Sequence, residues 1–178
     1  FKVPAVFFVQ NNGFAISTPR SVQTAAPTLG QKAAAAGVPG VVVDGMDPLA
    51  VYAVSKAARE WALAGKGPVV IEIISNRFGA HSLSGDDPMR YRSKEGLEEW
   101  KKHDPLIRFR AFLTEKKLWD SETEEAYIET VNLEITEAVK MADSIEKQKV
   151  SDFLENMFEE PTQIIQEQIE YYQAKEAK

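Results

Sequence analysis

Residues 5–14 read Ala5-Val6-Phe7-Phe8-Val9-Gln10-Asn11-Asn12-Gly13-Phe14, an apolar run followed directly by amides and a glycine. A short, continuous run of β-branched and aromatic residues is typical of a strand buried on both faces of a parallel sheet. Val41–Val43 and Val69–Ile74 have the same character. Helix signals separate the three runs, so the order of elements predicts an α/β fold with a parallel sheet flanked by helices.

The helix signals between the strands are capping residues. Thr28 with Gln31 forms a capping box ahead of a short helix over 32–36, and Gly37 ends it. Asp47 is an expected N-cap with Pro48 at the first helical position. Two neighbouring apolar faces follow on this second helix: Leu49, Ala53, Ala57 and Trp61 on one, and Ala50, Val54, Ala58 and Ala62 on the other. We expect both faces to contribute to the core.

The second half of the chain has a different organisation. Residues 76–93 show no periodicity, and a stretch of that length is usually a functional or mobile loop. Helices are then expected over 106–117 and 122–142, with Ser151 and Thr162 as N-caps of two more. The apolar stripe of the long helix comprises Ile128, Val131, Ile135, Val139 and Ala142. We therefore predict an α/β domain over 1–93, including the loop 76–93, and an acidic helical region over 94–178.

Composition excludes several classes of protein. The chain has 178 residues, 44% of them hydrophobic, with no cysteine, two histidines and a net charge of −6. Disulfides and thiolate metal sites are excluded, and a reducing, cytoplasmic location is expected. The acidic balance lies in the second half, which argues against nucleic-acid binding. No apolar run approaches the roughly 18–20 residues of a membrane-spanning helix. Because the chain starts with Phe1, we expect a fragment or a processed product.

Two stretches could carry chemistry. Asn11 and Asn12 follow the first strand, at the edge of the sheet where open α/β folds bind ligands. An amide oxygen there suits Mg²⁺ or Ca²⁺, but the local sequence favours the alternative, in which Asn-Asn-Gly is simply a turn. The loop 77–92 combines three arginines, two aspartates and His81. Arginine binds diphosphate well and histidine exchanges protons near neutral pH, but Arg–Asp pairs in a solvated loop are the alternative.

The only other histidine, His103, lies in the charged sequence Glu-Glu-Trp-Lys-Lys-His-Asp over 98–104. We interpret it as a surface residue at the end of a helix.

Four sequence elements together resemble a known family. Residues 6–18, VFFVQNNGFAIST, are similar to the second half of the thiamine-diphosphate motif, which runs from Gly-Asp-Gly to Asn-Asn. Val43-Asp44-Gly45-Met46-Asp47, the loop HSLSGDDPMRYR over 81–92 and the stretch DPLIRF over 104–109 follow in the family's order. The chain thus resembles the alpha subunit of the thiamine-dependent 2-oxo acid dehydrogenases, most closely those of Gram-positive bacteria that act on pyruvate.

This resemblance implies the C-terminal half of the alpha subunit of an α2β2 heterotetramer, with thiamine diphosphate and Mg²⁺ held between alpha and beta subunits. Asn12 would give Mg²⁺ its side-chain oxygen, and Phe14 its backbone carbonyl. Arg77 and His81 would border the diphosphate, with His81 as the catalytic residue. Ser82, also expected beside the cofactor, matches the position that is phosphorylated in animal relatives.

The implied reaction is oxidative decarboxylation of pyruvate, followed by reductive acetylation of the lipoyl group on the lipoyl domain of a dihydrolipoyl acyltransferase. Two departures from the family pattern stand out: the Gly-Asp-Gly half with its metal aspartate is absent, and Gln10 replaces the arginine of branched-chain relatives. Gly85 also makes the loop longer than in the pattern of the animal branched-chain relatives. A branched-chain 2-oxo acid or acetoin dehydrogenase, or a non-catalytic interaction module, are the alternatives.

Overall fold

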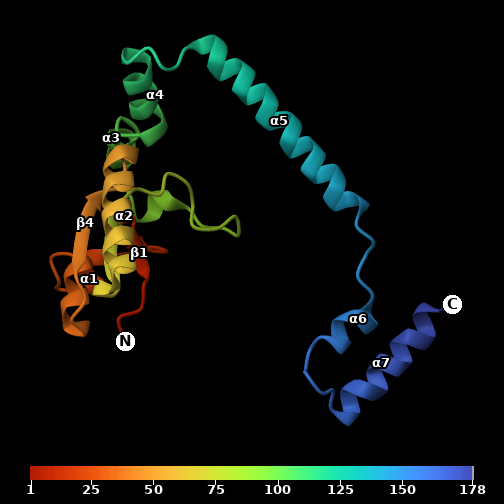
Figure 1. Ribbon diagram of the computed structural model, residues 1–178. Coiled ribbons are helices and arrows are strands. Elements are labelled where there is room, and N and C mark those ends of the chain that lie inside the picture. The colour runs from red at the N-terminus through yellow and green to blue at the C-terminus, as the bar shows by residue number, and fades with distance from the viewer. Residues whose placement is uncertain (178) are drawn as a thin grey trace. The chain divides into compact units, whose positions relative to one another are not determined.

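The computed structural model describes residues 1–177, which divide into two compact units, residues 1–120 and residues 121–177. The described part of the first unit contains a sheet of three parallel strands, β1 (Val6–Asn11), β4 (Gly40–Asp44) and β5 (Val69–Ile74). The strand order is β1-β5-β4, so β5 lies at the centre. Figure 1 labels the two outer strands, β1 and β4. The predicted parallel sheet is confirmed. The functional boundary between 1–93 and 94–178 stays a prediction.

The register of the sheet places three strand ends together. β5 pairs with β1 from Val6↔Val69 to Asn11↔Ile74, and with β4 up to Asp44↔Ile74. Because all three strands run in the same direction, Asn11, Asp44 and Ile74 end at one edge of the sheet. The segments that follow these strands are therefore brought to the same place, which is where α/β sheets bind ligands.

One face of the sheet packs against α2 (Pro48–Trp61). The Asp47 carboxylate accepts hydrogen bonds from the N–H groups of Leu49 and Ala50 at 3.0 and 3.2 Å, which confirms the predicted cap. The core consists of Val43, Ala58, Val69 and Ile71, with Ala50, Val51 and Val54 packed against them. Only one of the two predicted helix faces is buried: Leu49 and Trp61, on the other, are exposed, because a single sheet can cover only one side of the helix.

The opposite face of the sheet is met by η1, a 3-10 helix over Gly30–Ala36 that forms where a helix was expected. The Gln31 N–H donates to Thr28 Oγ1 at 3.2 Å, and Gly37 ends the helix with a positive φ of 65°. The expectation that β1 is buried on both faces is wrong. Phe7 and Phe8 are 56% and 52% exposed, since β1 is an edge strand of this sheet and neither helix reaches it fully.

A small hairpin follows β1 and was not predicted. It consists of β2 (Phe14–Ala15) and β3 (Thr18–Pro19), and α1 (Arg20–Gln23) comes directly after it. Ile16, in its turn, has a φ of +57°. A β-branched residue in the left-handed region is strained, because its Cβ approaches the backbone.

The remaining elements of the first unit follow α2 and β5 in the chain. η2 (Ala62–Lys66) extends α2 by a π-helical turn, and the predicted loop 76–93 is irregular and includes η3 (Pro88–Arg90). The helices α3 (Lys94–Lys101) and α4 (Pro105–Glu115) follow. Arg108 joins α4 to the connection after β4, donating to Met46 O at 2.8 Å and to Asp44 Oδ2 at 3.2 Å.

The second unit is helical, as expected, with α5 (Ser121–Ser144), α6 (Val150–Glu155) and α7 (Gln163–Glu176). Leu154 and Ile169 are buried between α6 and α7, and Thr162 caps α7 as predicted. Ser151 does not cap α6. It lies inside the helix and donates to Glu176 Oε2 at 2.5 Å, because the α7 carboxylate already accepts the first N–H groups of α6.

Two further features of the helices concern surfaces. The stripe predicted on α5 is largely exposed, including Ile128, Ile135 and Val139. Among residues 1–177, no helix has both the length and the apolar character needed to cross a membrane.

A substitution of Gly45 tests how closely the chain is packed at the carboxyl edge of the sheet. Its N–H donates to Ile74 O at 2.7 Å, and an added Cβ would lie 2.4 Å from Ile73 Cγ2 and 2.6 Å from Ile74 O. We expect Gly45→Ala to lower the free energy of unfolding by about 1–3 kcal/mol through overpacking. Urea denaturation measures this loss. Gly79→Ala is the matched control, because a Cβ there meets no atom within 4 Å, and an equal loss in both variants would contradict the steric argument.

Candidate functional site

The residues after β1 form two successive side-chain turns. Asn11 Oδ1 accepts a hydrogen bond from the Gly13 N–H at 3.0 Å, and Asn12 Oδ1 accepts one from the Phe14 N–H at 3.1 Å. Gly13 supplies the positive φ of 81° that the turn requires. The turn interpretation of Asn-Asn-Gly is therefore correct. It leaves a second lone pair on Asn12 Oδ1, so the turn and a ligand role are compatible.

A buried carboxylate lies behind this turn. Glu72, in the middle of β5, is only 1% exposed. Its Oε1 accepts from Asn11 Nδ2 at 2.6 Å, and its Oε2 accepts from the Gly30 N–H at 2.8 Å. We did not single out Glu72 from the sequence, although a lone acidic residue inside the apolar run Val-Val-Ile-Glu-Ile-Ile was a usable signal.

The hairpin directs a backbone carbonyl away from its partner strand. Phe14 pairs with Pro19, which has no N–H to donate, whereas the next residue, Arg20, donates to Gly13 O at 2.8 Å. In an antiparallel pair of this kind the Phe14 carbonyl points out of the ladder. It is therefore available to a ligand near Asn12.

A pocket of about 320 Å³ opens where these elements meet. Its polar lining includes Asn11, Asn12, Arg20, Thr28, Glu72 and Asn76, and Trp100 of α3 also lines it. A second recess shares Phe14, Asn76 and Trp100 and is lined further by Tyr91 and Arg92. The carboxyl edge of the sheet thus carries adjoining concave surfaces with amide, carboxylate and guanidinium groups.

The loop 76–93 is folded against the hairpin. Arg77 Nη2 donates to Ile16 O at 2.8 Å and to the Tyr91 hydroxyl at 3.0 Å. The Tyr91 hydroxyl in turn donates to Asp86, at 2.9 Å from Oδ2. Arg92 donates to Arg77 O, and its guanidinium lies 4.8 Å from the centre of the Phe14 ring. Arg77 is therefore joined to the hairpin that follows the Asn12 turn, although it is not among the residues that line the two recesses, and Tyr91 mediates the Arg–Asp interaction expected in the loop.

Two charged groups of the loop have shifted titration behaviour. The hydrogen bond from the His81 N–H, at 2.6 Å, is the main reason that the pKa of Asp86 is lowered, and the Tyr91 hydroxyl and the Arg77 charge act in the same direction. Burial, followed by the positive charge of Arg77, lowers the pKa of Arg92. The loop thus holds an ionised Asp86 beside two closely spaced guanidinium groups.

The predicted residues His81 and Ser82 lie on the exposed part of this loop. Ser82 Oγ accepts from the Ser84 N–H at 3.4 Å, and the His81 backbone is held by Asp86. Neither His81 nor Ser82 is among the described residues that line the two recesses. His103 is a surface residue, as predicted, with its Nε2 4.0 Å from Glu99 Oε1.

Several donors at the site lack acceptors. In the described part of the chain, four buried side-chain nitrogens have no hydrogen-bond partner: Asn76 Nδ2, Arg77 Nε, Arg92 Nε and Arg92 Nη2. All of them belong to the segment 76–92, and all are donors. The same residues 1–177 contain no cluster of three His, Cys, Asp or Glu side chains suited to a metal ion.

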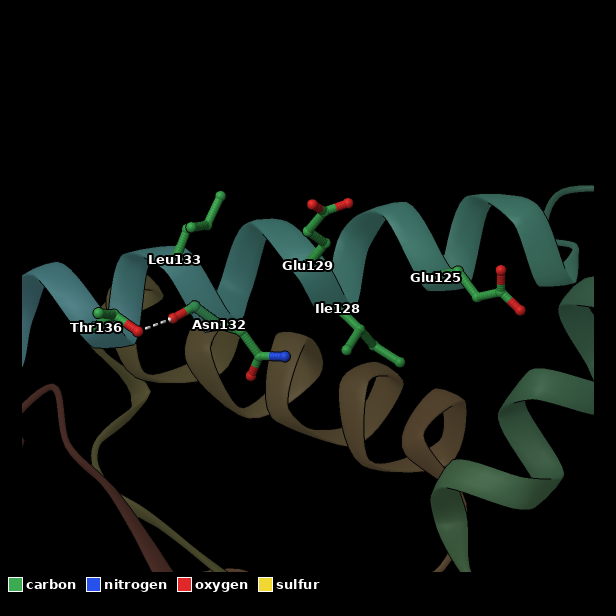
Figure 2. Close-up of a pocket in the computed structure, with 6 residues that line it drawn as sticks. All are labelled: Glu125, Ile128, Glu129, Asn132, Leu133 and Thr136. Carbon is green, nitrogen blue, oxygen red and sulfur yellow. Dashed lines mark hydrogen bonds between the residues drawn. The ribbon is translucent and has the colours of Figure 1, made fainter.

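A separate recess of about 370 Å³ runs along α5, and its lining comes entirely from that helix (Figure 2): Glu125, Ile128, Glu129, Asn132, Leu133 and Thr136. The Thr136 hydroxyl donates to the Asn132 backbone carbonyl at 2.7 Å. The labelled side chains point to different sides of the helix, so these six residues do not enclose a cavity by themselves.

The model of the family described as "Dehydrogenase E1 component" matches residues 1–151. The chain belongs to this family. It is 52% identical over 178 residues to the pyruvate dehydrogenase E1 component subunit alpha of Staphylococcus aureus (strain Mu50). It has the same identity to the subunit of that name from Staphylococcus epidermidis (strain ATCC 12228). The match covers 100% of this chain and 48% of each relative, so the chain spans about half the length of these curated relatives.

A substitution of Asp86 tests which contacts stabilise the loop 76–93 of this E1 chain. We expect Asp86→Asn to weaken its contacts to the His81 N–H and Tyr91, and to increase amide exchange across 80–92. The pKa of Asp86 is lowered in the folded protein. Its stabilising effect is therefore complete above the unfolded value of 3.8 and is lost as the pH falls through the lower, folded value.

Hydrogen exchange, expressed as protection relative to intrinsic rates, measures this effect. Wild-type protection of the loop should fall as the solution is acidified below pH 3.8, and the Asn variant should lack this step. Asp87→Asn is the matched control, because Asp87 instead caps η3 through the Met89 N–H at 3.0 Å. Equal loop protection in wild type and Asp86→Asn would show that the Asp86 contacts do not hold the loop.

Proposed function

We propose that the chain forms part of the alpha subunit of the decarboxylating component of a pyruvate dehydrogenase complex. The observation that carries this proposal is the 52% identity over all 178 residues to alpha subunits of that name. The proposed reaction is oxidative decarboxylation of pyruvate and reductive acetylation of a lipoyl group. We further propose a cytoplasmic α2β2 heterotetramer with a beta subunit, acting on the lipoyl domain of a dihydrolipoyl acyltransferase.

The carboxyl edge of the sheet is the proposed site for Mg²⁺ and thiamine diphosphate. The Asn12 side-chain oxygen and the Phe14 carbonyl are the proposed metal ligands: the first has a second lone pair beside its bond to the Phe14 N–H, and the second points out of the hairpin ladder. Oxygen donors of this type suit Mg²⁺, which usually also takes a carboxylate. When bound, thiamine diphosphate supplies the electron sink that allows a 2-oxo acid to lose carbon dioxide.

The loop 76–93 is the proposed partner of the diphosphate. Asn76, Arg77 and Arg92 carry buried donors without acceptors, and a diphosphate group offers several oxygens to such donors. Burial and the neighbouring guanidinium lower the pKa of Arg92, a sign of positive charges held together without full compensation. An anion near the loop would relieve that repulsion. These residues would then orient the cofactor and compensate its charge, as the arginine fork does in other phosphate sites.

His81 is the proposed acid for acetyl transfer to the lipoyl group. Cleavage of the lipoyl disulfide releases a thiolate, and an imidazolium near neutral pH can protonate it. The exposed position of His81 on the loop suits a group that must meet a lipoyl arm arriving from outside. Ser82, next to it, is a proposed modification position, because a phosphate there would add roughly −1.5 to −2 charges beside the diphosphate.

The metal ligands can be tested by binding. We expect Asn12→Ala to weaken Mg²⁺-dependent binding of thiamine diphosphate to the assembled enzyme by roughly ten-fold or more, since it removes a side-chain ligand. Isothermal titration calorimetry at fixed cofactor measures the Mg²⁺ affinity. Asn132→Ala, on the exposed surface of α5, is the control and should bind like wild type. Unchanged Mg²⁺ affinity in Asn12→Ala would exclude Asn12 as a ligand.

The proposed role of His81 separates two activities. His81→Ala should reduce reductive acetylation of a lipoyl domain by roughly 10²–10⁴-fold, the usual contribution of general acid catalysis. Decarboxylation measured with an artificial electron acceptor should change much less. His103→Ala, at the chain's other histidine, serves as the control. A parallel fall in both activities, rescued by excess cofactor, would instead assign His81 to seating the cofactor.

The preferred substrate distinguishes the proposed pyruvate dehydrogenase from the alternative dehydrogenases. Steady-state rates with pyruvate and with 3-methyl-2-oxobutanoate distinguish a pyruvate from a branched-chain dehydrogenase. Gln10, where branched-chain relatives have an arginine, favours pyruvate.

A further inference from the structure

Glu72 is unusual for its position in the sheet. It lies at the centre of β5, the strand that pairs on both sides, and only 1% of its surface is exposed. Burying a carboxylate is costly unless hydrogen bonds compensate both oxygens. The function proposed above assigns no role to this residue.

The two oxygens of Glu72 are compensated by donors from two different elements. Asn11 Nδ2, at the end of β1, donates to Oε1 at 2.6 Å. The Gly30 N–H, at the start of η1, donates to Oε2 at 2.8 Å. The Gly30 donor is a backbone N–H and cannot be exchanged for an acceptor, whereas the Asn11 amide presents its NH2 group because Glu72 offers only acceptors. Glu72 therefore joins the end of β1 to η1 across the central strand.

The hydrogen bond to Glu72 also determines the orientation of the Asn11 amide. With Nδ2 directed at the carboxylate, Oδ1 is left to accept the Gly13 N–H at 3.0 Å. This bond begins the turn in which Asn12 Oδ1 accepts the Phe14 N–H. The order of contacts runs from Glu72 through Asn11 and Gly13 to the residues that carry the ligand oxygens.

We propose that Glu72 is a positioning residue that fixes the Asn11 amide, and through it the turn that presents the oxygens of Asn12 and Phe14 to the cation. The binding of a cation at this site rests on the proposed function, whereas the effect of Glu72 on the turn is independent of it. Glu72 acts at one remove from the ligand, in the manner of the outer-shell partners that orient ligands at metal sites.

An isosteric variant makes the proposal testable. In Glu72→Gln the side-chain amide has one acceptor and one pair of donors. Its oxygen can accept the Gly30 N–H, but its NH2 group then faces Asn11 Nδ2, so two donors meet. Asn11 can relieve the conflict only by reversing its amide, which removes the acceptor of the Gly13 N–H. Glu60→Gln, the same change at an exposed position of α2, is the matched control.

A second substitution should reverse the defect. In the double variant Glu72→Gln/Asn11→Asp, the introduced carboxylate can accept from the new NH2 group with one oxygen and from the Gly13 N–H with the other. The pair keeps its total charge, with the polarity of the hydrogen bond exchanged. Asn11→Asp alone places two carboxylates in contact and should be at least as damaging as Glu72→Gln.

Two measurements on the full-length subunit assembled with its partner decide the proposal. The first is hydrogen exchange over 10–15 without cofactor. Glu72→Gln should reduce protection there by roughly five-fold, the loss of one hydrogen bond, and the double variant should restore it. The second is Mg²⁺ affinity by calorimetry, expected to fall roughly 10–100-fold in Glu72→Gln and to recover in the double variant.

The outcomes separate the two proposals. Wild-type protection in Glu72→Gln, or a double variant no better than its worse single variant, would overturn the positioning role. If Glu72→Gln does not assemble, restored assembly and protection in the double variant support the role, and failure of the double variant overturns it. If wild type itself binds no Mg²⁺–thiamine diphosphate, the proposed function fails, and the exchange measurement still decides whether Glu72 holds the turn.

Discussion

Parallel pairing of β5 with both β1 and β4 is the constraint on which the rest of the first unit depends. It places the ends of three strands at one edge, and the pocket is lined by residues at the ends of β1 and β5 and by the segments that follow them. Glu72 lies on this central strand, next to η1, and its two oxygens accept from Asn11 at the end of β1 and from the Gly30 N–H of η1. On the opposite face of β5, hydrophobic packing against α2 stabilises the sheet. One face of this strand therefore contributes to the core, and the other contributes Glu72 to the candidate site.

Local signals in the sequence were sufficient for most of the fold. Apolar runs located β4 and β5, and the capping residues Asp47 and Thr162 located two helices, because these signals act within a few residues. The errors involve partners distant in the chain. Ser151 was assigned as a cap because the competing carboxylate, Glu176, is 25 residues away. The exposure of Phe7 and Phe8 depends on which strand occupies the sheet edge, and no local pattern records that.

The candidate site shows the same division. Asn12, Arg77 and the loop 76–93 stood out by residue type and by their position after strands. Glu72 did not stand out, because its role depends on two donors that are distant in the chain. One is Asn11, 61 positions earlier, and the other is the backbone N–H of Gly30 in η1. The role of Tyr91 between Arg77 and Asp86 was also hidden, because the sequence shows opposite charges but not the hydroxyl placed between them.

Ile16 gives the hairpin a further property. Its backbone lies in a region that β-branched residues avoid, and Arg77 holds its carbonyl at 2.8 Å. Release of Arg77 would therefore free the turn to relax, and relaxation of the turn would withdraw the acceptor that anchors the loop. We therefore expect hairpin and loop to open together, with a free energy below that of global unfolding. A protease that cleaves within 76–93 would report the equilibrium of the whole unit, and any ligand seated on it would slow cleavage at sites it never touches.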